Sequence, residues 1–239
     1  MNIIKENLLK GCFELGIEIQ ADQIEQFEKY AFLLKDWNKR VNLTAILEPQ
    51  AIAIKHFVDS VALLAKVPIT YGARIVDVGT GAGFPGIPLK IMRPDVSVFL
   101  LDSLQKRVHF LNHVIGELSL QAISAYHGRA EEVGQNKEYR EQFDLAVSRA
   151  VSSLNVLAEL CLPLLHVGGV FIPLKGPQLE DELRDAKQAL KLLGGVVSEF
   201  TSYTLPISGD QRSIIVIEKT AQTPVKFPRR PGVPDKQPL

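Results

Sequence analysis

The sequence is poor in cysteine, which argues against one common kind of site. Only Cys12 and Cys161 occur among 239 residues, and no Cys-x-x-Cys pair or Cys/His cluster is present. A structural zinc site needs such a grouping. We therefore expect no metal, and the scarcity of cysteine favours a reducing compartment.

Long apolar runs and a net charge are also missing. No run approaches the roughly 20 apolar residues that a membrane-spanning helix needs, and the N-terminus carries Glu6 without a long apolar core. This start does not have the pattern of a signal peptide. Lys+Arg and Asp+Glu number 27 each, so any RNA binding must use local basic patches. We expect a monomer in the cytoplasm that contacts no membrane.

The first 70 residues have the pattern of helices. Apolar residues recur at helical spacing, as at Ile24, Phe27, Ala31 and Leu34. Pro49 suits the first turn of a later helix. A chain of this length can hold one large domain with a helical appendage, so we expect a helical extension over residues 1–70.

From Arg74 onward the pattern alternates between strands and helices. Strands are expected at Arg74–Val78, Val96–Asp102, Ala122–Tyr126, Phe143–Ser148 and Gly169–Leu174. Helices are expected at Gly86–Met92, Leu104–Leu118, Ser153–Leu165 and Leu179–Leu193. Apolar strands joined by helices favour a parallel sheet covered on both faces.

The last two strands distinguish between nucleotide-binding folds. Val196–Leu205 and Ser213–Glu218 are joined by Pro206–Arg212, which is too short for a crossover helix. We therefore expect an antiparallel hairpin at the end of a doubly wound sheet. This is the Rossmann-like α/β fold of class I methyltransferases that use S-adenosylmethionine, and we assign it to residues 71–220. A dehydrogenase sheet normally stays parallel throughout.

The remaining residues, 221–239, form a tail rich in proline and basic side chains. Arg229 and Arg230 lie between two of its five prolines, and Asp235 is its single acid. Such a segment is expected to be extended rather than helical. A solvated terminus and a phosphate-contacting arm both remain open.

The sharpest local signal is the glycine-rich segment Ile75–Phe84. Gly79, Gly81 and Gly83 follow the first strand and precede a helix, where absent side chains let a ligand approach the backbone. The spacing is G-x-G-x-G rather than the G-x-G-x-x-G of dinucleotide folds. Asp77 adds a carboxylate, which tolerates the ammonium and sulfonium of S-adenosylmethionine.

Two further positions are candidates for the rest of this cofactor. Asp102 ends the second strand, where carboxylates bind ribose hydroxyls, although Asp102 or Ser103 could instead cap the next helix. After the third strand, the backbone of Ala130 and Glu131 could bond an adenine ring. The alternative there is a plain loop that leads into a helix.

Arg149 ends the fourth strand and faces the usual ligand crevice. It could anchor the cofactor or the RNA backbone, or form a structural ion pair. The segment Ser148–Ala150 lacks the Asn/Asp-Pro-Pro-Tyr stretch of amino-nitrogen methyltransferases. Cys161, in an apolar helix, favours a buried hydrophobic role over that of a nucleophile. No catalytic side chain is assigned.

Several segments together resemble one family across nearly the whole chain. They are Trp37–Thr44, His56–Ser60, Asp77–Gly86, Gly128–Glu131, Ser148–Ala150, Leu174–Gly176 and Pro228–Gly232. The chain resembles the bacterial small-subunit ribosomal RNA guanine-N7 methyltransferases, also called glucose-inhibited division protein B. Asn42-Leu-Thr44 and the glycine loop extended by Phe84-Pro-Gly86 are the most specific elements.

The resemblance implies the reaction and the cofactor contacts. It implies methyl transfer from S-adenosylmethionine to N7 of guanosine 527, in the 530 loop of 16S rRNA. It also implies that Gly79, Phe84, Ala130, Glu131 and Arg149 contact the cofactor, with Asp102 and Ser103 near its ribose. Guanine N7 carries an available lone pair, so the reaction needs alignment more than a general base.

Other positions are weaker candidates. The polar residues His56, Asp59 and Ser60 share one helix face, which we expect to stabilise the contact with the catalytic domain. A role at the entrance for RNA stays open for them. The basic side chains expected to contact 16S rRNA or the small ribosomal subunit are Arg40, Lys106, Arg107, Arg229 and Arg230. Two alternatives stay open, namely an NAD-dependent oxidoreductase and a non-catalytic RNA-binding assembly protein on the same fold.

Overall fold

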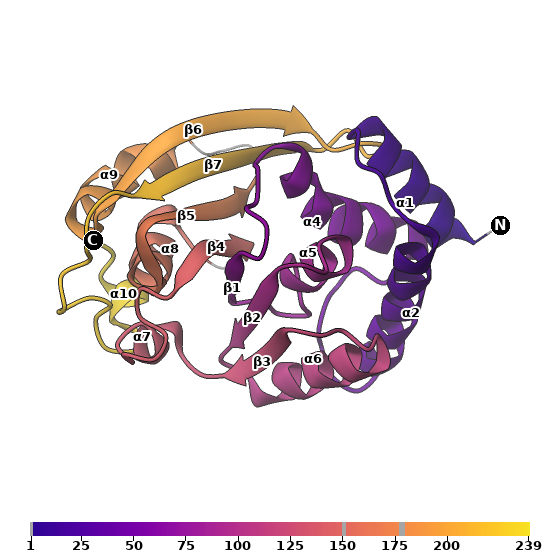
Figure 1. Ribbon diagram of the computed structural model, residues 1–239, viewed down its shortest axis with the longest axis horizontal. Coiled ribbons are helices and arrows are strands. Elements are labelled where there is room, and N and C mark those ends of the chain that lie inside the picture. The colour runs from indigo at the N-terminus through magenta and orange to yellow at the C-terminus, as the bar shows by residue number, and fades with distance from the viewer. Residues whose placement is uncertain (1, 150–151, 177–179) are drawn as a thin grey trace.

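A twisted sheet with helices on both faces forms the centre of the molecule (Figure 1). The computed structural model describes residues 2–149, 152–176 and 180–239. The strands within this part of the chain are β1 (Arg74–Val78), β2 (Ser97–Asp102), β3 (Ile123–His127), β4 (Phe143–Arg149), β5 (Leu165–Lys175), β6 (Gly195–Thr204) and β7 (Gln211–Lys219). Their order across the sheet is β3-β2-β1-β4-β5-β7-β6.

The strand directions confirm the predicted fold. β1 pairs with β2 and β4 in parallel, and β3 and β5 extend this parallel part on its two sides. β7 lies antiparallel to both β5 and β6. The predicted hairpin is therefore present, and β7 lies between β5 and β6.

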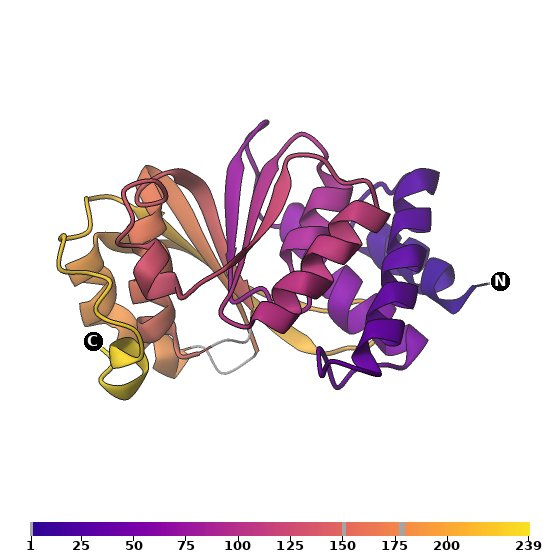
Figure 2. The ribbon, with the colours of Figure 1, turned by 90° about the horizontal axis from the view of Figure 1, so that it is seen from below.

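Helices cover the two faces of the sheet separately, as the turned view shows (Figure 2). One layer contains α1 (Ile3–Glu14), α2 (Ala21–Asn38), α5 (Gly86–Met92) and α6 (Gln105–Glu117), together with the helical stretch 49–65. The other layer contains α8 (Leu154–Cys161) and the short helix α7 (Ala130–Val133), with α9 (Glu180–Leu193). The predicted start of α9 at Leu179, like Ala150 after β4, lies outside the described residues.

The alternation of side chains along each strand explains the two layers. In β1, Ile75 belongs to the hydrophobic cluster on the N-terminal helix side, whereas Val76 and Val78 belong to the cluster on the α8 side. Successive side chains of a strand point to opposite faces, so apolar residues at consecutive positions are needed where both faces are covered. This is the pattern that predicted a doubly wound sheet.

The N-terminal helices help to form the wall of the glycine loop. The stretch 49–65 consists of α3 (Pro49–Ala51), a π-helical segment η1 (Ile52–Val58), α4 (Asp59–Val61) and a final 3-10 turn (Ala62–Ala65). From α2, Tyr30 donates its hydroxyl to the Ala82 carbonyl and stacks on Phe84 at 5.4 Å between ring centroids. The boundary predicted at residue 70 stays a prediction, while the helices on its N-terminal side share one hydrophobic cluster with the sheet.

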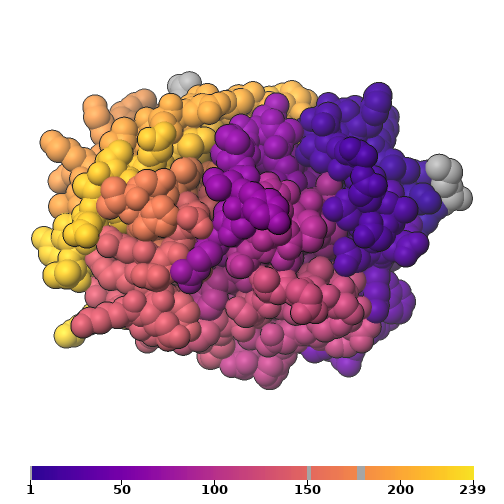
Figure 3. Space-filling view, viewed as in Figure 1, coloured from indigo at the N-terminus to yellow at the C-terminus, as the bar shows by residue number. Residues whose placement is uncertain are grey.

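The C-terminal tail packs against the fold, at the end of the molecule opposite the N-terminal helices (Figure 3). Phe227 is buried, and Arg140 donates to its carbonyl oxygen at 2.7 Å. The expectation of a wholly extended tail was wrong, because Val233–Lys236 form a short helix, α10. Gly232 precedes it with φ +79°, and Pro234 lies in the first turn, where a missing N–H costs nothing.

The two tail arginines lie in different surroundings. The Arg229 guanidinium forms an ion pair with Glu159 of α8, with Nη2 and Oε2 2.6 Å apart, and its backbone N–H donates to the same carboxylate at 2.8 Å. The Glu159 side chain is 1% exposed. Arg230 is exposed. A contact with RNA stays a prediction for both residues, while the structure assigns the Arg229 side chain a contact inside the protein.

We expect Arg229→Met to lower the free energy of unfolding by about 3 kcal/mol, because it leaves the buried Glu159 carboxylate without its charged partner. Arg230→Gln should leave this free energy unchanged within about 0.5 kcal/mol. Urea unfolding of the two variants and the unchanged chain measures the difference. Equal stabilities of the two variants would contradict a structural role for the Arg229 pair.

Candidate active site

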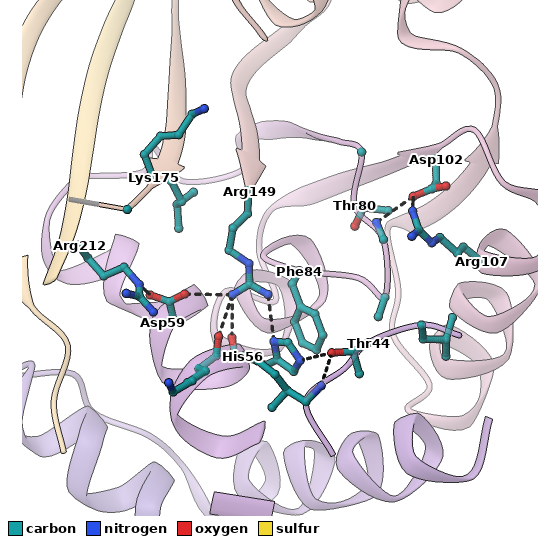
Figure 4. Close-up of a pocket in the computed structure, with 18 of the residues that line it drawn as sticks. Thr44, His56, Asp59, Thr80, Phe84, Asp102, Arg107, Arg149, Lys175 and Arg212 are labelled. Atoms are coloured by element: carbon teal, nitrogen blue, oxygen red, sulfur yellow. Dashed lines mark hydrogen bonds and ion pairs between the residues drawn. The ribbon is translucent and has the colours of Figure 1, made fainter. Parts of the chain in front are cut away.

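A cavity of about 620 Å³ opens at the carboxyl ends of the parallel strands. The turn after β1, the end of β2, the end of β4 and the end of β5 form one side of it. Thr44 and His56, from the N-terminal segment, form the other side (Figure 4). In open α/β sheets, ligands bind in the crevice outside the carboxyl ends of the strands, so this cavity is the candidate active site.

The glycine turn borders the cavity with bare backbone. Gly79, Gly81 and Gly83 have φ values of +71°, +62° and +98°, which residues with a side chain rarely adopt. A Cβ atom at Gly81 would have no heavy-atom neighbour closer than 4.0 Å, so this position is open. At Gly83 a Cβ would lie 2.5 Å from the Tyr30 hydroxyl and 2.6 Å from Ile87 Cδ1. Gly81 thus leaves room for a ligand, while Gly83 permits packing against α2 and α5.

Asp102 joins the turn to the next helix. Its Oδ2 atom accepts from the Gly81 N–H at 2.9 Å, and its Oδ1 atom accepts from the Leu104 N–H at 2.9 Å. The carboxylate therefore holds the backbone just before α6, whose N-cap residue is Leu104, and also lines the cavity. The Arg107 guanidinium lies 3.3 Å from Oδ2, so this predicted RNA contact pairs with Asp102. Binding of a ribose by Asp102 stays a prediction.

Asp77 is fully buried beneath the turn. Its Oδ2 atom accepts from the Thr80 hydroxyl at 2.7 Å and from the Gly86 N–H at 2.8 Å. Its Oδ1 atom has no partner among the described residues. Burial raises the pKa of this carboxyl to about 6. A buried acceptor without a partner favours a cationic ligand close to the turn.

Arg149, at the end of β4, is held by the N-terminal helical segment. Its Nη1 atom lies 3.3 Å from Asp59 Oδ2, 3.3 Å from the Ser60 hydroxyl and 3.3 Å from the Lys55 carbonyl. The guanidinium also lies over the Phe84 ring, 5.0 Å from the ring centroid. Arg149 thus forms the ion pair that one interpretation expected and also lines the cavity, while its contact with the cofactor or the RNA stays a prediction.

His56 stacks on Phe84 and lies within hydrogen-bond distance of Arg149. The rings of His56 and Phe84 are 4.4 Å apart at an angle of 14°. Nδ1 of His56 lies 3.3 Å from Arg149 Nη2, and Nε2 lies 2.9 Å from the Thr44 hydroxyl. Burial, and secondarily the charge of Arg149, lower the pKa of the imidazole to about 3. His56 is therefore neutral near pH 7.

This low pKa predicts acid sensitivity. The unfolded chain takes up a proton on His56 below about pH 6.5, whereas the folded chain does not until about pH 3. The contribution of His56 to the free energy of unfolding should therefore fall on acidification, by up to about 1.4 kcal/mol per pH unit within this window. His56→Gln should lack this contribution.

Ring-proton NMR tests the same point directly. The His56 resonances should stay constant between about pH 5 and pH 8. Half-exposed His166, whose pKa is raised by the Val167 carbonyl and by Asp144, should titrate and serve as an internal control. A His56 resonance that moves with a midpoint near pH 6.5 would contradict the buried, neutral imidazole.

The structure brings together most, but not all, of the predicted site residues. Those that line the cavity are Gly79, Gly81, Phe84, Asp102, Ser103, Arg107 and Arg149. Gly83 lies behind the turn, and Ala130 and Glu131 lie in α7, outside the lining of this cavity. The Glu131 carboxylate accepts from the Gly232 N–H at 2.9 Å, so it also fixes the tail. A contact of Ala130 and Glu131 with the cofactor stays a prediction.

Sequence reasoning missed part of the cavity wall. Thr44, Lys55, Lys175 and Arg212 line it without having been assigned a role. His56 and Asp59 were expected mainly to stabilise a contact between segments, with a role at the entrance for RNA left open. Their spacing on an apolar helix was a usable signal, because buried polar residues need polar partners, and Arg149 is that partner.

Two further features bear on which ligands the site can hold. Across the described ranges, no three His, Cys, Asp or Glu side chains are grouped as a metal site requires. Likewise, none of the described helices is both long and apolar enough to cross a bilayer. The open glycine turn, the buried Asp77 and Asp102 carboxylates and the cavity volume fit S-adenosylmethionine, which has positive charge and no pyrophosphate.

Fold and site together define a class I methyltransferase, and solved structures agree on the fold. A SAM-dependent methyltransferase from Aquifex aeolicus is similar with a TM-score of 0.53 and 16% identity, over 72% of this chain and 94% of that one. TYW2 from M. jannaschii, solved with AdoMet, has a TM-score of 0.51 and 13% identity, over 85% of this chain and 78% of that one.

Sequence comparison identifies the family. The model of the family described as rRNA small subunit methyltransferase G matches residues 23–215. A relative from Pelotomaculum thermopropionicum, named ribosomal RNA small subunit methyltransferase G, is 49% identical over all 239 residues and covers 100% of both chains. The chain belongs to the rRNA small subunit methyltransferase G family. The predicted resemblance is thereby confirmed.

Proposed function

We propose that this chain transfers a methyl group from S-adenosylmethionine to N7 of a guanine in the RNA of the small ribosomal subunit. One observation carries the proposal. The bare glycine turn and the buried cluster of Arg149, His56 and Phe84 face the same cavity. Within a family of rRNA methyltransferases, this juxtaposition provides a cofactor surface and a surface for an entering base.

Different groups of the cavity wall would bind the cofactor and the base in this reaction. S-adenosylmethionine supplies an electrophilic methyl group on a sulfonium centre. The glycine turn and Asp102 would hold its polar parts, and Asp77 Oδ1, which has no partner among the described residues, would add negative potential beneath the turn. Phe84 and His56 present stacked aromatic surface at the other side. These groups orient and exclude water, which is the main requirement when the nucleophile is already a free lone pair.

The absence of an assigned general base agrees with N7 as the target. Both nitrogens of His56 are engaged, by Arg149 and by Thr44. Cys161 is fully buried in α8, and burial raises the pKa of its thiol well above the ordinary value. Neither side chain is placed to take a proton or attack a base. A ring carbon as the acceptor needs a nucleophile, and an amino nitrogen needs an acceptor for its proton, whereas N7 needs neither.

The finer details of the substrate follow from the family resemblance. We propose guanosine 527 in the 530 loop of 16S rRNA as the target and the cytoplasm, where ribosomes assemble, as the location. The chain would act as a monomer. Exposed Arg40, Lys106 and Arg230 are the predicted RNA contacts that are not engaged in buried ion pairs; Arg40 does pair with exposed Asp36.

Two measurements separate this proposal from its alternatives. Calorimetric titration should show binding of S-adenosylhomocysteine and no binding of NADH. The opposite result would favour an oxidoreductase. Purified protein should then transfer a labelled methyl group to small subunits from cells that lack the enzyme. Cofactor binding without any transfer would favour a non-catalytic assembly protein.

A further inference from the structure

The hydroxyl group of Thr44 makes two hydrogen bonds at the edge of the cavity. The Ile46 N–H donates to Thr44 Oγ1 at 3.0 Å, and Nε2 of His56 lies 2.9 Å from the same oxygen. The backbone of Thr44 is also held in place, because its N–H donates to Asn38 Oδ1 at 2.9 Å. Figure 4 shows Thr44, His56 and Arg149 as one continuous set of contacts.

The direction of these hydrogen bonds follows from Arg149. A guanidinium has donors only, so its Nη2 atom, 3.3 Å from Nδ1 of His56, requires Nδ1 to be an acceptor. The Lys55 carbonyl also lies near the imidazole and raises its pKa slightly, but among the described residues only Arg149 Nη2 has hydrogen-bond geometry to Nδ1. A neutral imidazole carries one proton. That proton is therefore on Nε2, and His56 donates to Thr44.

This arrangement makes Thr44 an obligate donor. A hydroxyl oxygen has two lone pairs and one proton. Both lone pairs accept, from His56 and from Ile46, so only the O–H remains. No acceptor for it occurs among the described residues, and Thr44 lines the cavity. The O–H is therefore available to a ligand there.

Most other side-chain donors around the cavity already have acidic partners. The ion pairs are Lys55 with Asp210, Lys175 with Glu182, Arg212 with Asp59, Arg149 with Asp59 and Arg107 with Asp102. The Thr80 hydroxyl donates to Asp77. The Ser103 hydroxyl remains, but it adjoins Asp102, whereas Thr44 adjoins the stacked rings of His56 and Phe84.

Guanine and adenine differ at the atom that such a donor would contact. Both have N7, but guanine carries the acceptor O6 beside it, whereas adenine carries the donor N6 amino group. A donor on N7 itself would occupy the lone pair that reacts. A hydroxyl that can only donate thus favours guanine, because it can hydrogen-bond to O6. With adenine, the hydroxyl and the N6 amino group would both be donors, and leaving them unpaired in a dehydrated site costs binding free energy.

We propose that Thr44 is a specificity-determining residue that donates a hydrogen bond from its hydroxyl to O6 of the target guanine. Arg149 and His56 are positioning residues, because they leave the Thr44 hydroxyl free to act only as a donor. The inference rests on the proposed function and adds the contact that selects the base. Removing this one hydrogen bond should cost roughly 10- to 100-fold in kcat/KM, because O6 is then left unpaired.

The experiment combines changes in the protein with changes in the base. Thr44→Val removes the donor at nearly constant volume, Thr44→Ser keeps it, and Thr201→Val, on edge strand β6, is the matched control. Small subunits are reconstituted with guanosine, adenosine or 2-aminopurine riboside at the methylated position. 2-Aminopurine keeps N7 but lacks O6. Titration with S-adenosylhomocysteine measures cofactor affinity independently of activity.

The unchanged chain should methylate guanosine roughly 10- to 100-fold better than 2-aminopurine. Thr44→Val should lose this preference through slower reaction with guanosine, with adenosine and 2-aminopurine little affected and cofactor affinity unchanged. Thr44→Ser and Thr201→Val should behave like the unchanged chain.

Equal loss on all three bases, or a matching loss of cofactor affinity, would show a merely structural Thr44 and overturn the proposal. If Thr44→Val does not fold, the unchanged chain still tests the proposal. Equal rates on guanosine and 2-aminopurine would overturn it. An unchanged chain that methylates no base would instead refute the proposed function, and with it this inference.

Discussion

Arg149→Met is expected to reduce methyl transfer by roughly 100-fold or more, because the cavity-lining groups His56 and Phe84 lose the side chain that both contact. The Arg149 side chain is 13% exposed and contacts Asp59, Ser60 and His56 while lying over Phe84. Methionine keeps much of the volume but none of the donors. The free energy of unfolding should fall by about 3 kcal/mol, since a buried ion pair is broken on one side.

The second partner of Asp59 limits the loss of stability. Arg212 Nε lies 2.8 Å from Asp59 Oδ1, so this carboxylate keeps one cation after the substitution. Arg149→Lys should restore stability in part but activity poorly, because one ammonium cannot reproduce the planar set of donors. Steady-state kinetics and urea unfolding measure the two effects. Arg74→Met, at the opposite end of the sheet, is the control, and activity of Arg149→Met within about twofold of the unchanged chain would contradict the account.

Gly81→Val is expected to weaken cofactor binding by roughly 100-fold or more while the fold persists. The position has φ +62° and an open Cβ direction at the cavity. A valine side chain would therefore occupy ligand space. Left-handed backbone at a residue with a side chain costs about 1–2 kcal/mol, which is a modest loss. Calorimetric titration with S-adenosylhomocysteine measures the affinity, and circular dichroism checks the fold.

Gly83→Ala is the matched control for this loop. Its new Cβ would collide with the buried Tyr30 hydroxyl and Ile87 rather than with a ligand. It should therefore destabilise the protein more than Gly81→Val does, because overpacking adds about 1–3 kcal/mol to the backbone strain. Retained cofactor affinity in Gly81→Val would contradict the assignment of the turn as the cofactor surface.

Local patterns were enough to predict the architecture. Consecutive apolar residues such as Ile75 and Val76 signalled a strand covered on both faces, and the short link after residue 205 signalled the hairpin. The glycine turn was predictable because positive φ restricts the choice of residue. These features depend on neighbours in the sequence, where spacing rules apply.

The opposite wall of the cavity could not be predicted in this way. Asp59 and Arg212 are 153 positions apart, and Arg149 and His56 are 93 apart. No periodic pattern encodes such pairs, because they arise only when the N-terminal helices close over the carboxyl ends of the strands. The tail was misjudged for a related reason: its composition favours disorder, whereas buried Glu159 and half-buried Arg140 bind its backbone.

The function proposed for the cavity at the carboxyl ends of β1 and β4 is methylation of N7 of one guanine in small-subunit RNA. Its most direct test is mass spectrometric mapping of the methyl group that the purified protein transfers, from labelled S-adenosylmethionine, to small subunits that lack the modification. The expected product is 7-methylguanosine at a single site in the 530 loop, and the signal should be lost in Gly81→Val. A methyl group on another atom or in another RNA, or equal labelling by Gly81→Val, would contradict it.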